Sequence, residues 1–169
     1  LNGSKIFITN AEVAEYIVVF ATLDRSQGHR GVCAFVVQKG SPGLEINPQK
    51  GKMGIRGSGT NEVIFQNTPV PESNLIGEEG RGFRYAMDIL DTSRIVVAAQ
   101  CVGIGQAALE HAVKYAQQRQ TFGKSLSSHQ AIQFMLADMA TSVHASRSIT
   151  MEAATLKDSG LPFNNEASM

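Results

Sequence analysis

The chain has 169 residues, which is enough for one domain or for parts of two. Fifteen basic residues balance fifteen acidic ones, which excludes the strong positive field that a nucleic-acid-binding protein uses. No apolar run approaches the roughly 20 residues of a membrane span, so no membrane span is expected. The two cysteines give no disulfide framework and are expected to be small buried side chains in a reducing compartment.

The first half of the chain is punctuated by turn residues. Twelve of the sixteen glycines lie at or before Gly82, and four of the five prolines lie between Pro42 and Pro71. Runs of β-branched and aromatic residues between these turns are expected to be strands. They are Lys5 to Thr9, Tyr16 to Thr22, Val32 to Gln38 and Glu62 to Gln66. This spacing predicts an antiparallel sandwich or open barrel over residues 1–80.

The second half changes to helical spacing. No proline occurs between Gly82 and Arg119, and apolar residues recur there at a helical period. A helix of about 55 Å is therefore expected, with a kink near Gly103 and Gly105. A second helix is expected from about Ser128 to Ser159. The short connection predicts an antiparallel hairpin of an up-down helix bundle over residues 81–169, and hence an α+β protein.

The ends of the chain suggest an internal piece of a longer protein. It opens with Leu1-Asn2-Gly3, already inside a turn, and closes with what reads as the first turn of a helix before Met169. Two helices alone leave an apolar face uncovered. Further helices after Met169, or a partner chain, are expected to cover it.

A glycine motif in the first long helix imitates a dinucleotide site. Gly103 to Ala108 matches the pattern G-x-G-x-x-A. A nucleotide-binding fold needs a second buried strand within about 30 residues, ending in an acidic group. No acidic residue occurs between Glu110 and Asp138. Close packing of two helices explains the glycines better.

The connection between the two helices carries more chemistry than a turn needs. Arg119 suits a pyrophosphate, because its planar fork donates to two oxygens at once. Local roles are equally open: Arg119 stabilises a helix end, Gly123 permits a turn, and Ser127 to Gln130 fits a capping box. These roles explain Thr121 and Phe122 poorly. The residues by themselves leave both interpretations open.

Other candidates are weaker. Asp91 and Arg94 share one face of the first helix and form either a surface ion pair or part of a site. Phe7 to Thr9 end a strand and could border a planar ligand. The four histidines show no metal-ligand spacing with the cysteines, and the serines lack catalytic partners. Metal and nucleophilic catalysis are therefore not expected.

Several segments together resemble the acyl-CoA dehydrogenase family, nearest its short- and medium-chain branch, which includes butyryl-CoA dehydrogenases. They occur in family order over essentially the whole chain: Leu-Asn-Gly-x-Lys-x-Phe-Ile-Thr-Asn at 1–10, Val70-Pro71, Ile76-Gly77-x-x-Gly80-x-Gly82-Phe83, and Arg119-x-x-Phe122-Gly123-Lys124 with Gln130. The resemblance implies a middle β domain followed by the start of the C-terminal four-helix domain, with FAD between them.

The resemblance also implies site residues. Phe7, Ile8 and Thr9 match the segment that lines the flavin ring. Five further residues match family positions that hold the pyrophosphate and adenosine half of the FAD of a neighbouring subunit: Arg119, Thr121, Phe122, His129 and Gln130. Asp91 and Arg94 match the helix that borders acyl-CoA, and His29-Arg30 falls near a loop that approaches CoA.

In the family reaction, a glutamate removes the α-proton of an acyl-CoA while the β-hydride goes to flavin N5. The short- and medium-chain branch carries this base in a late loop, which would lie beyond Met169. Another branch carries it on the first long helix, where this chain has Ser93. No catalytic residue is therefore expected within the chain, and the isolated piece is expected to be inactive.

The resemblance further implies electron-transfer flavoprotein as the electron acceptor, a homotetramer built as a dimer of dimers, and either the mitochondrial matrix or the bacterial cytoplasm. Two alternatives stay open. One is an acyl-CoA oxidase-like flavoenzyme, and the other is a non-catalytic CoA- or FAD-binding or assembly member of the same fold.

Overall fold

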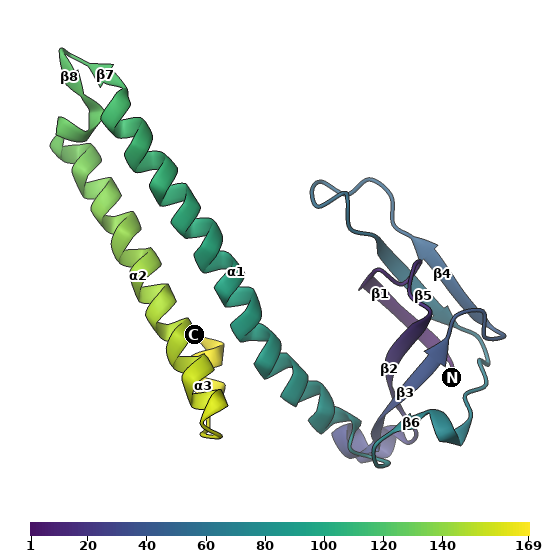
Figure 1. Ribbon diagram of the computed structural model, residues 1–169. Helices are drawn as coiled ribbons and strands as arrows, with labels where there is room; N and C mark the ends of the chain where they lie inside the picture. Colours follow the sequence, from purple (N-terminus) through teal and green to yellow (C-terminus); the bar gives the residue numbers. More distant parts are fainter. The chain divides into compact units, whose positions relative to one another are not determined.

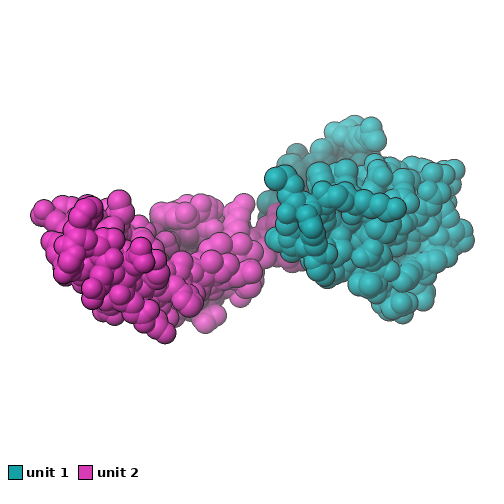
Figure 2. All heavy atoms as spheres, turned by 90° about the horizontal axis from the view of Figure 1, so that it is seen from above, with its two compact units in different colours: residues 1–87 teal, residues 88–169 magenta.

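The computed structural model describes residues 1–169, and the chain divides into two compact units (Figures 1 and 2). Residues Leu1–Met87 contain most of the strands and the first turns of a long helix, and residues Asp88–Met169 are mainly helical. This composition confirms the expected α+β class, with an antiparallel sheet part followed by a helical part.

The first unit contains two antiparallel three-stranded sheets. One has the order β1-β5-β4 and the other β2-β3-β6. The strands are β1 (Gly3–Thr9), β2 (Tyr16–Thr22), β3 (Val32–Gln38), β4 (Leu44–Pro48), β5 (Thr60–Phe65) and β6 (Leu75–Ile76). Two short 3₁₀ helices, η1 (Arg25–Gly31) and η2 (Glu72–Asn74), complete the unit.

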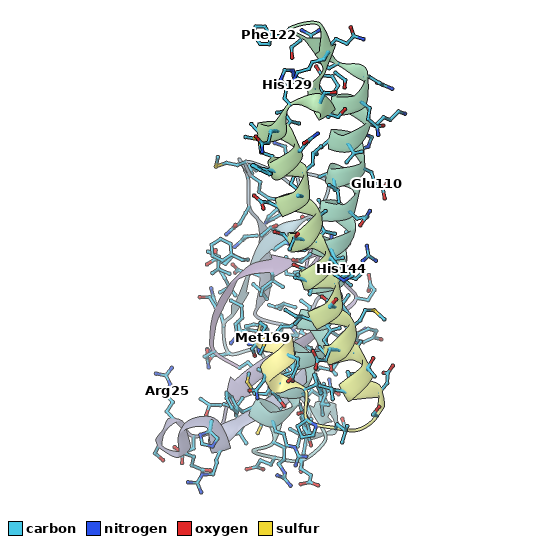
Figure 3. The ribbon with its side chains drawn as sticks, turned by 90° about the vertical axis from the view of Figure 1, so that its left-hand side faces the viewer. Arg25, Glu110, Phe122, His129, His144 and Met169 are labelled. Carbon is cyan, nitrogen blue, oxygen red and sulfur yellow. The ribbon has the colours of Figure 1, made fainter.

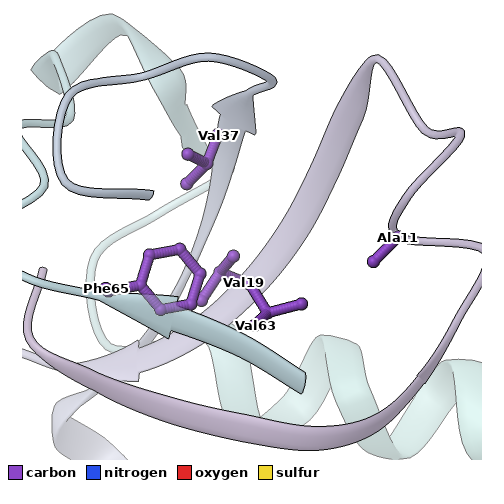
Figure 4. Close-up of a cluster of buried hydrophobic side chains, with 5 residues drawn as sticks. All are labelled: Ala11, Val19, Val37, Val63 and Phe65. Atoms are coloured by element: carbon purple, nitrogen blue, oxygen red, sulfur yellow. The ribbon is translucent and has the colours of Figure 1, made fainter. Parts of the chain in front are cut away.

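The core of this unit is formed by β-branched and aromatic side chains from both sheets. Val19 on β2, Val37 on β3, and Val63 and Phe65 on β5 are buried together with Ala11 (Figure 4). Alternate residues of β5 face this core, as expected for a strand with one buried face. Asn61 lies on the same buried face and is the only polar residue there.

The strand predictions are confirmed in position for β1, β2, β3 and β5, and two strands were missed. The strand β4 escaped because it ends in Pro48, a residue that argues against a strand in sequence. The strand β6 is only two residues long and has no periodicity to detect. Cys33 is buried as expected, whereas Cys101 is exposed.

The second unit is a helical hairpin. The helix α1 (Gly82–Gln118) begins at the end of the first unit, and α2 (Gln130–Asp158) runs back beside it (Figure 1). Between them lie β7 (Gln120–Thr121), β8 (Lys124–Ser125) and the 3₁₀ turn η3 (Leu126–Ser128), and α3 (Asn164–Ser168) follows. The helix α1 is uninterrupted, so the kink expected near Gly103 does not break it.

The helices expose many large apolar side chains. Only Ala116 and Ala153 are buried hydrophobic residues of this unit, while Ile89, Val96 and Phe134 are exposed. By length and composition alone, α1 is long and apolar enough to cross a membrane, a test that the core helix of a soluble protein also passes. An apolar helix face of this extent requires a cover, as the sequence also indicated.

The two glycines of α1 differ in their surroundings, which predicts different effects of alanine. A Cβ at Gly103 meets no atom within 4 Å, whereas a Cβ at Gly105 meets Val143 Cγ2 at 3.3 Å. We expect Gly103→Ala to raise the free energy of unfolding by about 0.5–1 kcal/mol through helix propensity. Gly105→Ala should gain less, because Val143 must move. Chemical denaturation of both variants checks this, and equal gains would contradict close packing at Gly105.

Candidate functional site

The connection between α1 and α2 is a two-stranded β-hairpin rather than a plain helix-to-helix turn. Gln120 pairs with Ser125 and Thr121 pairs with Lys124. Phe122 and Gly123 form the two-residue turn between them, with φ values of 51° and 78°. Positive φ at both central residues is the type I′ arrangement, whose twist suits a tight hairpin.

Phe122 occupies a costly position. A bulky side chain rarely adopts positive φ, and such strain costs on the order of 1–3 kcal/mol. The ring is also 97% exposed, at the tip of the hairpin (Figure 3). Neither the turn nor a core explains an aromatic residue here. Strained, exposed residues of this kind cluster where a ligand or partner binds.

His129 contacts two residues at the tip of the hairpin, Thr121 and Phe122. Its Nε2 atom lies 3.3 Å from both the hydroxyl and the backbone carbonyl oxygen of Thr121. Its ring also meets the ring of Phe122 edge to face, with centroids 6.3 Å apart. The structure therefore brings three of the predicted cofactor residues, Thr121, Phe122 and His129, into one cluster. Figure 3 labels Phe122 and His129 at this end of the helices.

Arg119 and Gln130 flank this cluster with exposed polar groups. Arg119 directly follows the last residue of α1, and its side chain makes no hydrogen bond or ion pair. Gln130 is the first residue of α2 and is also exposed. The tip therefore presents a free guanidinium and a free amide beside an exposed ring.

The predicted capping box was wrong. The residue at the N-cap of α2 is His129, and no side chain caps the helix. Gln130 does not reach back to the Ser127 amide; instead Gln133 Nε2 donates to the Ser127 carbonyl at 2.8 Å. The 3₁₀ turn η3 displaces the helix start by two residues, which removes the reciprocal geometry that a capping box needs. The local role proposed for Gln130 therefore disappears.

The segment Phe7 to Thr9 contains a second strained aromatic residue. Lys5 pairs with Val63 and Ile8 pairs with Asn61, so β1 has one more residue than β5 in this interval. That is a β-bulge, a feature frequent beside active sites. Phe7 has φ 62° and is 68% exposed, while Ile8 packs against the core. The bulge presents the Phe7 ring to solvent.

Asp91 and Arg94 form an ion pair at 3.0 Å, which is part of a larger network. Asn164 Nδ2 donates to the second carboxylate oxygen of Asp91 at 2.5 Å, and Arg94 Nη1 also reaches Ser168 Oγ at 3.3 Å. Both added residues belong to α3. No sequence pattern points to these two residues, because they lie more than 70 residues away along the chain.

The loop that carries His29 and Arg30 is organised by Asp24. Asp24 accepts hydrogen bonds from the hydroxyl and the amide of Ser26, and these bonds lower the pKa of its carboxyl group. The His29 ring packs against Phe83 with centroids 5.5 Å apart. Arg30 lines a small pocket of about 140 Å³ with Glu79 and Gly80.

Ser93 lies at the helix position where the resemblance implies a base in another branch, and it is not an acid. The Ser93 hydroxyl donates to the Leu90 carbonyl at 2.9 Å, within its own helix. No group of three or more His, Cys, Asp or Glu side chains could hold a metal ion. An apolar pocket of about 330 Å³ lies between α1, α2 and α3, with Arg94 at its border.

Comparison with known proteins covers the whole chain. The acyl-CoA dehydrogenase middle domain matches residues 1–68, and the acyl-CoA dehydrogenase C-terminal domain matches residues 80–169. The mitochondrial short-chain specific acyl-CoA dehydrogenase of Bos taurus is 48% identical over all 169 residues, which span 41% of that protein.

Two solved structures have similar backbones. Butyryl-CoA dehydrogenase from Megasphaera elsdenii is 48% identical, with a TM-score of 0.92 over 99% of this chain and 44% of that one. A chain in a structure of the electron transferring flavoprotein of Acidaminococcus fermentans is 51% identical, also with a TM-score of 0.92, over 100% of this chain and 44% of its own. The present chain thus spans less than half of the proteins it matches, and it belongs to the acyl-CoA dehydrogenase family.

Proposed function

We propose that the protein carrying this chain is an FAD-dependent acyl-CoA dehydrogenase that oxidises the α,β bond of a short acyl-CoA thioester. The observation that carries the proposal is the hairpin tip, where Arg119 and Gln130 are exposed without hydrogen-bond partners, the Phe122 ring is exposed, and His129 contacts both Thr121 and Phe122. The identity of 48% to a short-chain enzyme and to butyryl-CoA dehydrogenase supports the substrate class.

The residues present fit FAD. A free guanidinium fork suits a pyrophosphate, and an exposed amide and aromatic ring suit a nucleoside. We assign five residues of the hairpin to the pyrophosphate and adenosine half of FAD: Arg119, Thr121, Phe122, His129 and Gln130. The FAD that they contact is the one bound mainly by a neighbouring subunit. The strained Phe7, with Ile8 and Thr9, is assigned to the flavin ring, because a planar ring system is best bordered by an aromatic side chain and a hydroxyl.

Asp91 and Arg94 are assigned to acyl-CoA. Arg94 keeps about half of its side chain exposed while one nitrogen is held by Asp91, so the guanidinium is oriented but accessible. A cation fixed in this way suits the anionic groups of CoA. The loop with His29 and Arg30 is a second region for the same ligand.

Bound FAD supplies the two-electron acceptor for the β-hydrogen of the substrate. The α-proton requires a carboxylate base, and this chain offers none at the helix position where Ser93 lies. We therefore place the glutamate base in the part of the protein that follows Met169. The chain itself contributes residues that bind and orient FAD and acyl-CoA. We propose that its two domains meet between residues 80 and 81.

The proposed partners are acyl-CoA and electron-transfer flavoprotein, within a homotetramer. The resemblance to a chain in a structure of electron transferring flavoprotein supports the electron acceptor. The exposed apolar faces of α1 and α2 support assembly with further helices. The relatives include a mitochondrial enzyme and proteins from bacteria, which supports the matrix or the bacterial cytoplasm.

Flavin content and turnover test the function. We expect the whole protein to contain FAD and to oxidise butyryl-CoA with electron-transfer flavoprotein as acceptor, whereas the 169-residue chain should be inactive. Efficient transfer to oxygen, with release of peroxide, would instead favour an oxidase. Turnover by the isolated chain would show that the base lies within it, contrary to the proposal.

A further inference from the structure

One buried polar residue of the sheet unit has no role in the assignments above. Asn61 on β5 is 0% exposed and lies on the strand face that Val63 and Phe65 share with the core. A polar amide in such a position is unfavourable unless its hydrogen bonds are made. Here the side-chain oxygen of Asn61, Oδ1, has no hydrogen-bond partner.

The side-chain nitrogen of Asn61 does make a hydrogen bond. Asn61 Nδ2 donates to the Ile8 carbonyl at 3.1 Å, across 53 residues of sequence. Ile8 is the first residue paired again after the β1 bulge, and its partner in the ladder is Asn61 itself. Asn61 Nδ2 thereby ties β5 to the first paired residue of β1 after the bulge, where the ladder is locally disrupted.

We propose that Asn61 is a positioning residue that holds the β1 bulge, and with it the left-handed Phe7, in the geometry that receives the flavin. The proposal rests on the function proposed above. Phe7 at φ 62° persists only if its surroundings fix the strand on both sides of it. Lys5 is fixed by its pairing with Val63, and Ile8 is fixed by Asn61.

The backbone beyond Ile8 is held by backbone pairing with the residues just before Asn61, so Asn61 is one of several contacts that fix this end of β1. Thr9 pairs with Thr60, and the Asn10 amide donates to the Gly59 carbonyl at 3.0 Å. Thr60 in turn accepts a hydrogen bond from Lys52 Nζ at 2.9 Å. Of these contacts, only that of Asn61 places an incompletely bonded polar group inside the core.

The test replaces Asn61 with leucine, which has similar volume but no donor. We expect hydrogen exchange at the Phe7 and Ile8 amides of the whole protein to become about tenfold faster, as for the loss of one hydrogen bond. Flavin retention should weaken by a similar factor, with unchanged or higher resistance to unfolding. The matched control is Thr68→Val, because Thr68 is also 0% exposed with an unpartnered hydroxyl but lies away from the bulge. The control should change neither exchange at Phe7 nor flavin retention.

A second variant separates positioning from packing. The carboxyl group of Asn61→Asp donates to the Ile8 carbonyl only when it is protonated, so the excess of exchange at Ile8 over the wild-type protein at the same pH should shrink as the pH is lowered. Unchanged exchange in both variants would overturn the proposal, as would faster exchange with unaltered flavin retention. If the wild-type protein binds no flavin, the proposed function fails, whereas the exchange measurement still decides whether Asn61 holds the bulge.

Discussion

Replacing Arg119 with alanine is expected to weaken FAD retention by about 10- to 100-fold, the usual contribution of hydrogen bonds from a charged group. The guanidinium is exposed at the hairpin tip and makes no bond within the chain, so its removal leaves the fold without a lost contact. Arg119→Lys should lose a large part of the same affinity, because an ammonium cannot donate two parallel hydrogen bonds. FAD dissociation from the whole protein, followed by flavin fluorescence, measures the effect.

Lys124 provides the matched control for this prediction. It is an exposed cation of the same hairpin, and the one hydrogen bond of its side chain runs from Nζ to the Ser128 carbonyl at 3.4 Å. Lys124→Ala removes the same charge from the same tip and should change FAD retention by less than about threefold. Equal losses of FAD retention in the two alanine variants would mean that the positive charge of the hairpin attracts FAD without a specific hydrogen-bonding role for Arg119. The assignment of Arg119 to the pyrophosphate would then be wrong.

Phe122→Asn is expected to change stability and cofactor binding in opposite directions. Asparagine tolerates positive φ better than phenylalanine, and Asn-Gly is the preferred pair for a type I′ turn. The free energy of unfolding should therefore rise by about 1 kcal/mol. FAD retention should fall about tenfold, because the exposed ring and its edge-to-face contact with His129 are lost.

Phe122→Leu separates the two effects. It retains an apolar side chain and the unfavourable φ but removes the aromatic ring, so stability should stay nearly constant while FAD retention falls. Chemical denaturation and flavin dissociation are measured on the same samples. A loss of stability in Phe122→Asn would show that the ring supports the hairpin itself, and the functional reading of the strained turn would then fail.

The strand and helix pattern was largely accessible from the sequence. The strands β2 and β3 begin and end at the predicted residues, because β-branched runs between turn residues determine them locally. The two long helices were equally accessible from their period and their lack of proline. Pro48 concealed β4, and the hairpin at residues 120–125 was concealed because Phe-Gly is not a usual pair for its turn.

The candidate residues were found through the family resemblance, while the reasons for their positions come from the structure. Nothing in the sequence shows that Phe7 and Phe122 both have positive φ, since backbone strain depends on pairing with other segments. Nothing links Asp91 to Asn164 either, because that contact joins α1 to α3. Asn61 looks like an ordinary strand residue until the register of β1 against β5 is known.

The sequence by itself determined the class of the fold, the family, and the residues proposed to serve FAD and acyl-CoA. These follow from local periodicity and from short motifs, which need no knowledge of distant contacts. Only the tertiary structure decided how those residues are presented: the bulge that exposes Phe7, the tight hairpin that exposes Phe122, and the buried amide of Asn61 beneath the bulge. Each of these depends on hydrogen bonds between segments that the chain brings together only on folding.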